Sequence, residues 1–209
     1  MSKEKAQRFL FIGVLILVFS VFFISLSLLE PSPNHEDPPE ELPQEPPGED
    51  IPVVYETILA PLNVVDYQTI RKYWSYDAPT EDQHLSIIVF GSRYYMSKGI
   101  SYSKNDQEFE VIACLSGTVT KVVDSPTYGK CVTIDHGEGL VSEYMSLSTL
   151  SVEEGDEVEQ GFVIGFSGTN EYDQEAGVHV HFQLKYQDKN INPELLIGKK
   201  INEVASLIK

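Results

Sequence analysis

Short apolar runs separated by turn residues constrain the fold of this chain more than any other feature of its sequence. Each run is rich in Val, Ile, Phe and Tyr, and Gly, Asp, Asn, Ser and Pro stand between the runs, as in residues 125–129 and 135–139. Many short strands with closely spaced turns are typical of an all-β sandwich or barrel rather than of βαβ units. The expected strands cover residues 53–59, 69–74, 85–90, 109–115, 117–123, 131–135, 141–145, 162–166 and 178–186.

Two histidines mark the last of these expected strands. His179 and His181 flank Val180, and side chains two apart in a β-strand share a face. The pair therefore points one way, while Val178, Val180 and Phe182 point the other way, as in a half-buried strand. Two imidazoles on one face can bind zinc, but a catalytic zinc needs three protein ligands, a water and a base for that water. The function therefore depends on which residues stand at the remaining positions.

An uncharged apolar run of about 21 residues, 9–29, is long enough to cross a bilayer as a helix. A cleavable signal peptide has a shorter apolar region and a small-residue exit, whereas residues 28–31 read Leu-Leu-Glu-Pro, which favours an uncleaved anchor. Basic residues cluster in residues 1–8, and the next one after the run is Arg71. This asymmetry predicts a cytoplasmic N-terminal tail and an exported remainder.

Beyond the expected transmembrane helix, residues 30–52 consist mainly of Pro, Glu and Asp, a composition that favours an extended stalk. About 155 residues remain, enough for one compact domain. Its expected parts are an N-terminal extension (53–84), a β domain (85–197) and a C-terminal helix (198–209) with Ile201, Val204, Ala205 and Ile208 on one face.

The formal net charge of -17 leaves no basic footprint for a nucleic-acid partner. Cys114 and Cys131 are the only cysteines of the chain. A disulfide is chemically permitted in an exported domain, but both residues lie in apolar runs, which favours two buried free thiols over a bridge.

A series of motifs, taken in order, resembles the lysostaphin/LytM-type zinc endopeptidases of bacterial cell walls. The motifs are residues 117–119, 128–137, 144–147, 152–158, 161–168 and 179–182. The resemblance extends from about residue 85 to residue 195 and implies an antiparallel β fold of the duplicated hybrid motif type, with a groove. It also implies zinc held by a His-x-x-x-Asp element and the second His of His-x-His. The first His of that pair and the His of a Tyr-x-His-Leu strand would handle the water proton.

The metal positions depart from this pattern. Residues 95–102 align with the His-x-x-x-Asp element, which places Ser97 at the ligand His and Ser101 at the ligand Asp. Only His181 keeps its family residue. A serine hydroxyl is a poor ligand for Zn²⁺, and the site loses its anionic ligand. We therefore expect Ser97, Ser101 and His181 to be degenerate metal positions, with no catalytic zinc and no other cofactor.

The catalytic positions are also incomplete. Ser146 stands where the active-site His of the Tyr-x-His-Leu strand belongs, and His179 alone is kept. We therefore expect no catalytic residue here. The retained histidines are interpreted as a hydrogen-bonding remnant of a zinc site, with weak metal binding as the alternative.

Three other residues could in principle supply the missing chemistry. His136 lies in a hairpin turn, which favours a role in the turn over ligation, and His84 follows an acidic stretch that predicts a solvated loop. Ser167 has neither Gly-x-Ser-x-Gly spacing nor a surrounding βα unit, which disfavours a nucleophile.

Within the family, the resemblance is to membrane-anchored sporulation members with one N-terminal span, a stalk and a serine at the ligand His. It implies a non-catalytic module in the forespore membrane that binds a membrane-anchored protein across the intermembrane space, in a ring-like hetero-oligomer that contributes to engulfment. One alternative is an active zinc-dependent peptidoglycan endopeptidase, which the intact His-x-His would support. The other is an activator of a cell-wall amidase, although such activators usually carry heptad runs and none is present.

Overall fold

The chain divides into two units, residues 1–52 and 53–209, and the computed structural model describes residues 55–208. The expected tail, transmembrane helix and stalk lie outside the described residues. Within residues 55–208, no helix has the length and apolar character to span a membrane.

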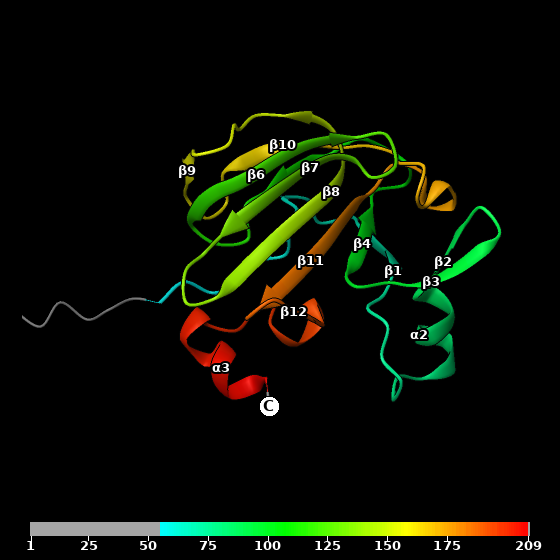
Figure 1. Cartoon of the computed structure of the whole chain (residues 1–209), viewed down its shortest axis with the longest axis horizontal. Coiled ribbons are helices and arrows are strands. Elements are labelled where there is room, and N and C mark those ends of the chain that lie inside the picture. Colours follow the sequence, from blue (N-terminus) through cyan, green and yellow to red (C-terminus); the bar gives the residue numbers. More distant parts are fainter. Residues whose placement is uncertain (1–54, 209) are drawn as a thin grey trace, which may run out of the picture. The chain divides into compact units, whose positions relative to one another are not determined.

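The described unit is mostly antiparallel β-sheet, as expected (Figure 1). The main path of a ten-stranded sheet runs β1-β4-β11-β8-β7-β6-β9, β10 pairs with β5 and β8, and β12 pairs with β11. The strands are β1 (Gln68–Arg71), β4 (Ile100–Ser103), β5 (Glu110–Ile112), β6 (Gly117–Ser125), β7 (Gly129–Asp135), β8 (Leu140–Leu150), β9 (Glu157–Val158), β10 (Val163–Ser167), β11 (Val180–Tyr186) and β12 (Lys189–Ile191).

A second, two-stranded sheet pairs β2 (Ile87–Phe90) with β3 (Arg93–Met96). Figure 1 shows this hairpin set apart from the broad surface of β6, β7, β8 and β11. The expected strand at 53–59 was wrong for its described part, because Thr57 forms only an isolated bridge to Lys200.

The helices are short and differ from the expectation. They are α2 (Thr80–Leu85), the 3-10 turns η1 (Gln174–Ala176), η2 (Pro193–Leu195) and η3 (Ile201–Glu203), and α3 (Val204–Leu207). The expected C-terminal helix is therefore reduced to η3 and α3. Val204 is 2% exposed, and the half-buried Ile201 and Ile208 also pack against the core, so three of the four residues of the expected face dock and only Ala205 is exposed. Helix formation in so short a segment depends on such packing.

β11 is an interior strand of the sheet and lies between β4 and β8. Val180, Phe182 and Leu184 are fully buried, and the Phe182 ring lies 5.3 Å from that of Tyr144. The alternation predicted for this strand is confirmed, but its other face is also buried, with His181 at 6% exposure. The strand is therefore not half-buried as expected, because its polar face is the floor of a pocket.

Candidate functional site

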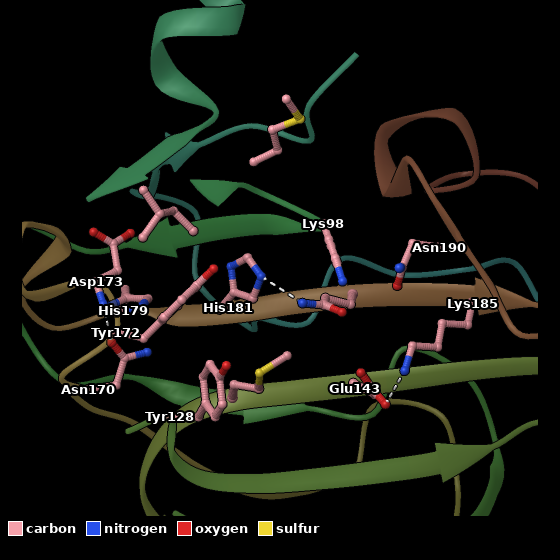
Figure 2. Close-up of a pocket in the computed structure, with 14 residues that line it drawn as sticks. Lys98, Tyr128, Glu143, Asn170, Tyr172, Asp173, His179, His181, Lys185 and Asn190 are labelled. Atoms are coloured by element: carbon pink, nitrogen blue, oxygen red, sulfur yellow. Dashed lines mark hydrogen bonds and ion pairs between the residues drawn. The ribbon is translucent and has the colours of Figure 1, made fainter. Parts of the chain in front are cut away.

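The polar face of β11 forms the floor of a pocket of about 290 Å³. Three side chains that alternate along β11 line it, namely His181, Gln183 and Lys185, and His179 joins them from the position just before the strand. Figure 2 shows His181 at the centre and Lys185 paired with Glu143 at one end. The same period of two that buries Val180 and its neighbours therefore directs these polar groups into the pocket.

Ser101 and His181 form the first of two serine–histidine pairs. They are directly opposite each other in the β4–β11 register, and Ser101 Oγ lies 2.8 Å from His181 Nδ1. The Gln183 amide, 3.1 Å from Nε2, donates to that nitrogen, so Nδ1 carries the ring proton and donates to Ser101. Burial, with His179 nearby, lowers the pKa of His181 to about 4. The ring is therefore neutral at pH 7.

Ser146 and His179 form the second pair. His179 Nδ1 lies 2.8 Å from the Gly177 carbonyl oxygen, which can only accept, so Nδ1 is the donor. Its Nε2 then accepts from the Ser146 hydroxyl at 2.8 Å, and the Asn170 amide donates to Ser146 Oγ at 2.5 Å. Burial lowers the pKa of His179, while the hydrogen bond to Gly177 opposes the shift. Every polar atom of this pair has a partner.

The backbone of Ser146 is held in the left-handed region, with φ of 66°. This conformation is unfavourable for a residue with a Cβ, and it persists only where surrounding contacts impose it. One such contact is the Ser146 amide, which donates to the Tyr128 carbonyl at 2.9 Å. The strained position is the one predicted from the sequence to correspond to an active-site histidine.

A buried ion pair fixes the loop that carries Asn170. Arg71 on β1 binds both carboxylate oxygens of Asp173, at 2.8 and 2.9 Å, and the two side chains are only 14% and 4% exposed. The Asp173 amide donates in turn to Asn170 Oδ1 at 2.7 Å. Sequence reasoning missed all three residues, and the only local signal was an Asn-x-x-Asp spacing in a turn-rich stretch.

Ser97 is not part of either pair. Its hydroxyl donates to the Gly99 carbonyl at 2.9 Å, within the turn between β3 and β4. This turn lies tightly against β11, since a Cβ added at Gly99 would stand 2.1 Å from the Phe182 carbonyl oxygen. The structure thus brings Ser101, Ser146 and the two histidines into two pairs and leaves Ser97 in a local hydrogen bond.

These residues do not fit a zinc ion. The Ser101 oxygen is hydrogen-bonded to His181 Nδ1, and the two carboxylates that line the pocket, Asp173 and Glu143, are paired with Arg71 and Lys185. Zinc prefers thiolate, imidazole or carboxylate ligands. Among residues 55–208, no group of three or more His, Cys, Asp or Glu side chains is placed to hold a metal.

The other candidate histidines lie elsewhere. His136 follows β7, donates from Nδ1 to the Ser116 carbonyl at 2.8 Å and accepts from Ser142 at 2.7 Å. These bonds join the hairpin turn to its neighbours, and burial lowers the pKa of His136. His84 is exposed, as expected, but lies on α2 rather than in a loop.

The structure also shows the surroundings of Ser167 and of the two cysteines. Ser167 is fully buried and accepts from the Phe109 amide. Both cysteines are free, but only Cys114 is buried, whereas Cys131 is half-buried. Burial raises the pKa of each thiol to about 11.

Comparisons with known proteins agree on one family. The model of Peptidase family M23 matches residues 95–193. Stage II sporulation protein Q of Bacillus subtilis (strain 168) is 37% identical over 145 residues, which is 68% of this chain and 51% of that relative. The match thus spans about half the length of that protein.

Solved structures agree in fold. The structure of the SpoIIQ-SpoIIIAH pore forming complex contains a chain with 34% identity and a TM-score of 0.71, covering 75% of this chain and 100% of that one. A crystal structure of the SpoIIIAH and SpoIIQ complex gives 36% identity and a TM-score of 0.64, covering 66% and 98%.

Proposed function

The chain belongs to peptidase family M23, and we propose that it is a non-catalytic member that acts in sporulation by binding another membrane protein. The observation that carries this proposal is the pairing of both retained histidines with serines. Ser101 and Ser146 stand at the ligand and active-site positions, and each is hydrogen-bonded to a histidine at 2.8 Å. Each histidine that would bind a metal or move a proton is instead hydrogen-bonded to a serine.

The hydrogen bonds of His179 and Ser146 support the same conclusion. His179 donates through Nδ1 to a backbone carbonyl and accepts through Nε2 from Ser146, and both residues are fully buried. A general base must reach the proton that it removes, directly or through one water. Neither nitrogen is free to do so, and Ser146 is not accessible as a nucleophile.

The partner proposal comes from the relatives. Two similar solved structures are complexes of SpoIIQ with SpoIIIAH. By this similarity we assign this chain a partner of the same kind, stage III sporulation protein AH, in a ring-like hetero-oligomer. Residues 9–29 would anchor the chain in the forespore membrane with the N-terminus cytoplasmic, and residues 30–52 would extend the domain toward a facing membrane during engulfment.

A binding and activity measurement on residues 53–209 tests this proposal. The fragment is the compact unit that contains the described core. We expect it to bind the purified extracytoplasmic domain of SpoIIIAH from the same organism, and to leave purified peptidoglycan intact with added zinc. About one tightly held zinc per chain together with peptidoglycan cleavage would establish the endopeptidase alternative instead. Capture of an amidase whose activity rises on binding would establish the activator alternative.

A further inference from the structure

The β2–β3 hairpin presents an apolar face that nothing covers in the described part of the chain. Ile87 pairs with Met96 and Val89 with Tyr94, and paired residues share a face. Val89 is 40% exposed, Tyr94 77% and Met96 57%. Two-stranded hairpins are marginally stable alone, and a contiguous exposed apolar surface marks an interaction site.

The backbone amide and carbonyl groups on the outer edge of β3 are also placed to pair with another strand. The Ser97 amide donates to the Ser86 carbonyl at 2.8 Å, which makes these two a hydrogen-bonded pair at the base of the hairpin. Hydrogen-bonded and non-hydrogen-bonded pairs alternate in an antiparallel ladder, so the amide and carbonyl groups of Tyr94 and Met96 point outward from β3. Within residues 55–208, no other segment forms a hydrogen bond with them.

The inner face holds the hairpin in place. Phe90 and Tyr95 each lie 5.6 Å from the ring of Tyr172, which lies 5.0 Å from Tyr128. Tyr128 and Tyr172 also line the β11 pocket, and so does Met96 from the outer face of the hairpin. The open edge is therefore positioned before any partner arrives, which reduces the ordering cost of binding.

We propose that the β3 edge accepts an extended strand of the partner protein, whose alternate apolar side chains cover Val89, Tyr94 and Met96. This inference rests on the proposed function and assigns the surface that performs it. An added strand explains both observations. Its backbone would pair with the outward amide and carbonyl groups of Tyr94 and Met96, and its side chains would bury the exposed apolar face of the hairpin. The net charge of -17 disfavours a second copy of this chain or an anionic membrane surface as the occupant.

Binding of the full chain in detergent micelles to the extracytoplasmic domain of SpoIIIAH tests the edge. The substitution Tyr94→Lys should weaken binding at least about tenfold, because it removes an aromatic contact and places a charge on the docking face. The control Val65→Lys changes an apolar residue that is 93% exposed elsewhere, and should stay within about twofold. Circular dichroism and thermal melting confirm that both variants fold.

Hydrogen exchange separates strand addition from side-chain contact alone. In the native complex, the amides of Tyr94 and Met96 should exchange at least about tenfold more slowly than in the free chain. If these amides exchange at the same rate in the complex and Tyr94→Lys binds SpoIIIAH as tightly as the native chain, the β3 edge is not the binding surface. The proposed function would then still stand. Failure of the native chain to bind SpoIIIAH would overturn both. Self-association of the native chain that Tyr94→Lys abolishes would assign the edge to a second copy, against the proposal.

Discussion

Ser101 Oγ lies 2.8 Å from His181 Nδ1, on residues that face each other directly across β4 and β11. A neutral hydrogen bond therefore joins the two residues predicted from the sequence to align with a ligand aspartate and a ligand histidine. Because the pair is buried, neither partner can be removed without leaving an unsatisfied polar group.

Zinc uptake tests whether Ser97 and Ser101 occupy metal-ligand positions. The double substitution Ser97→His with Ser101→Asp supplies an imidazole and a carboxylate beside His181, and we expect about one zinc per chain by elemental analysis. The same double variant with His181→Gln is the control and should bind none. A folded double variant without metal would show that residues 95–102 are wrongly aligned with the His-x-x-x-Asp element.

Two substitutions of Ser146 separate its hydrogen bonds from its backbone strain. Ser146→Ala leaves His179 Nε2 and the Asn170 amide unpaired and should lower the free energy of unfolding by about 1–3 kcal/mol. Ser146→Gly loses the same bonds, but glycine tolerates the φ of 66°, so it should be about 1 kcal/mol less destabilising than alanine. Urea unfolding measures both. Equal stability of the two variants would contradict the left-handed conformation.

Stability should fall on mild acidification because His181 is buried in its neutral form. Its folded pKa of about 4 is below the usual 6.5, so the unfolded chain binds more protons between these values. The contribution is therefore complete above pH 6.5 and is lost as the pH falls toward 4. Between pH 6.5 and pH 5 the free energy of unfolding should drop by about 2 kcal/mol from this residue. His181→Gln should have a shallower pH dependence, and an equal slope would argue against a depressed pKa.

Loss of the buried Arg71–Asp173 pair should lower the free energy of unfolding more than loss of an exposed ion pair. Arg71→Ala leaves the Asp173 carboxylate, 4% exposed, without its cation, and should cost about 3–5 kcal/mol of unfolding free energy. Lys130→Ala removes the partner of Asp124, which is 74% exposed, and should cost under about 1 kcal/mol. Chemical denaturation compares the two, and similar losses would contradict the structural difference between them.

The expected strands were most reliable where the hydrophobic period was strong. β11 was predicted with its two faces, because Val180, Phe182 and Leu184 alternate with polar residues. β4 was missed, since two of its four residues are serines that become buried only by pairing with β1 and β11. β9 and β12 were missed because they are two and three residues long and depend on their sheet partners.

The sequence did not predict how the candidate site residues pair. Ser101 lies beside His181 and Ser146 beside His179 because of the register of strands that are distant in sequence. The Arg71–Asp173 pair joins residues 102 positions apart, and no local pattern indicates it. Ser97 was placed at a ligand position, but its hydroxyl serves a local turn, which spacing alone does not reveal.

The Asn170 amide, 2.5 Å from Ser146 Oγ, limits the size of the side chain that position 146 can hold. An imidazole at position 146 would need the space that this amide occupies, and Asn170 is itself held by the Asp173 backbone. A side chain larger than serine at position 146 would therefore have to displace the Asn170 amide, and with it the hydrogen bond that joins Asn170 to Asp173.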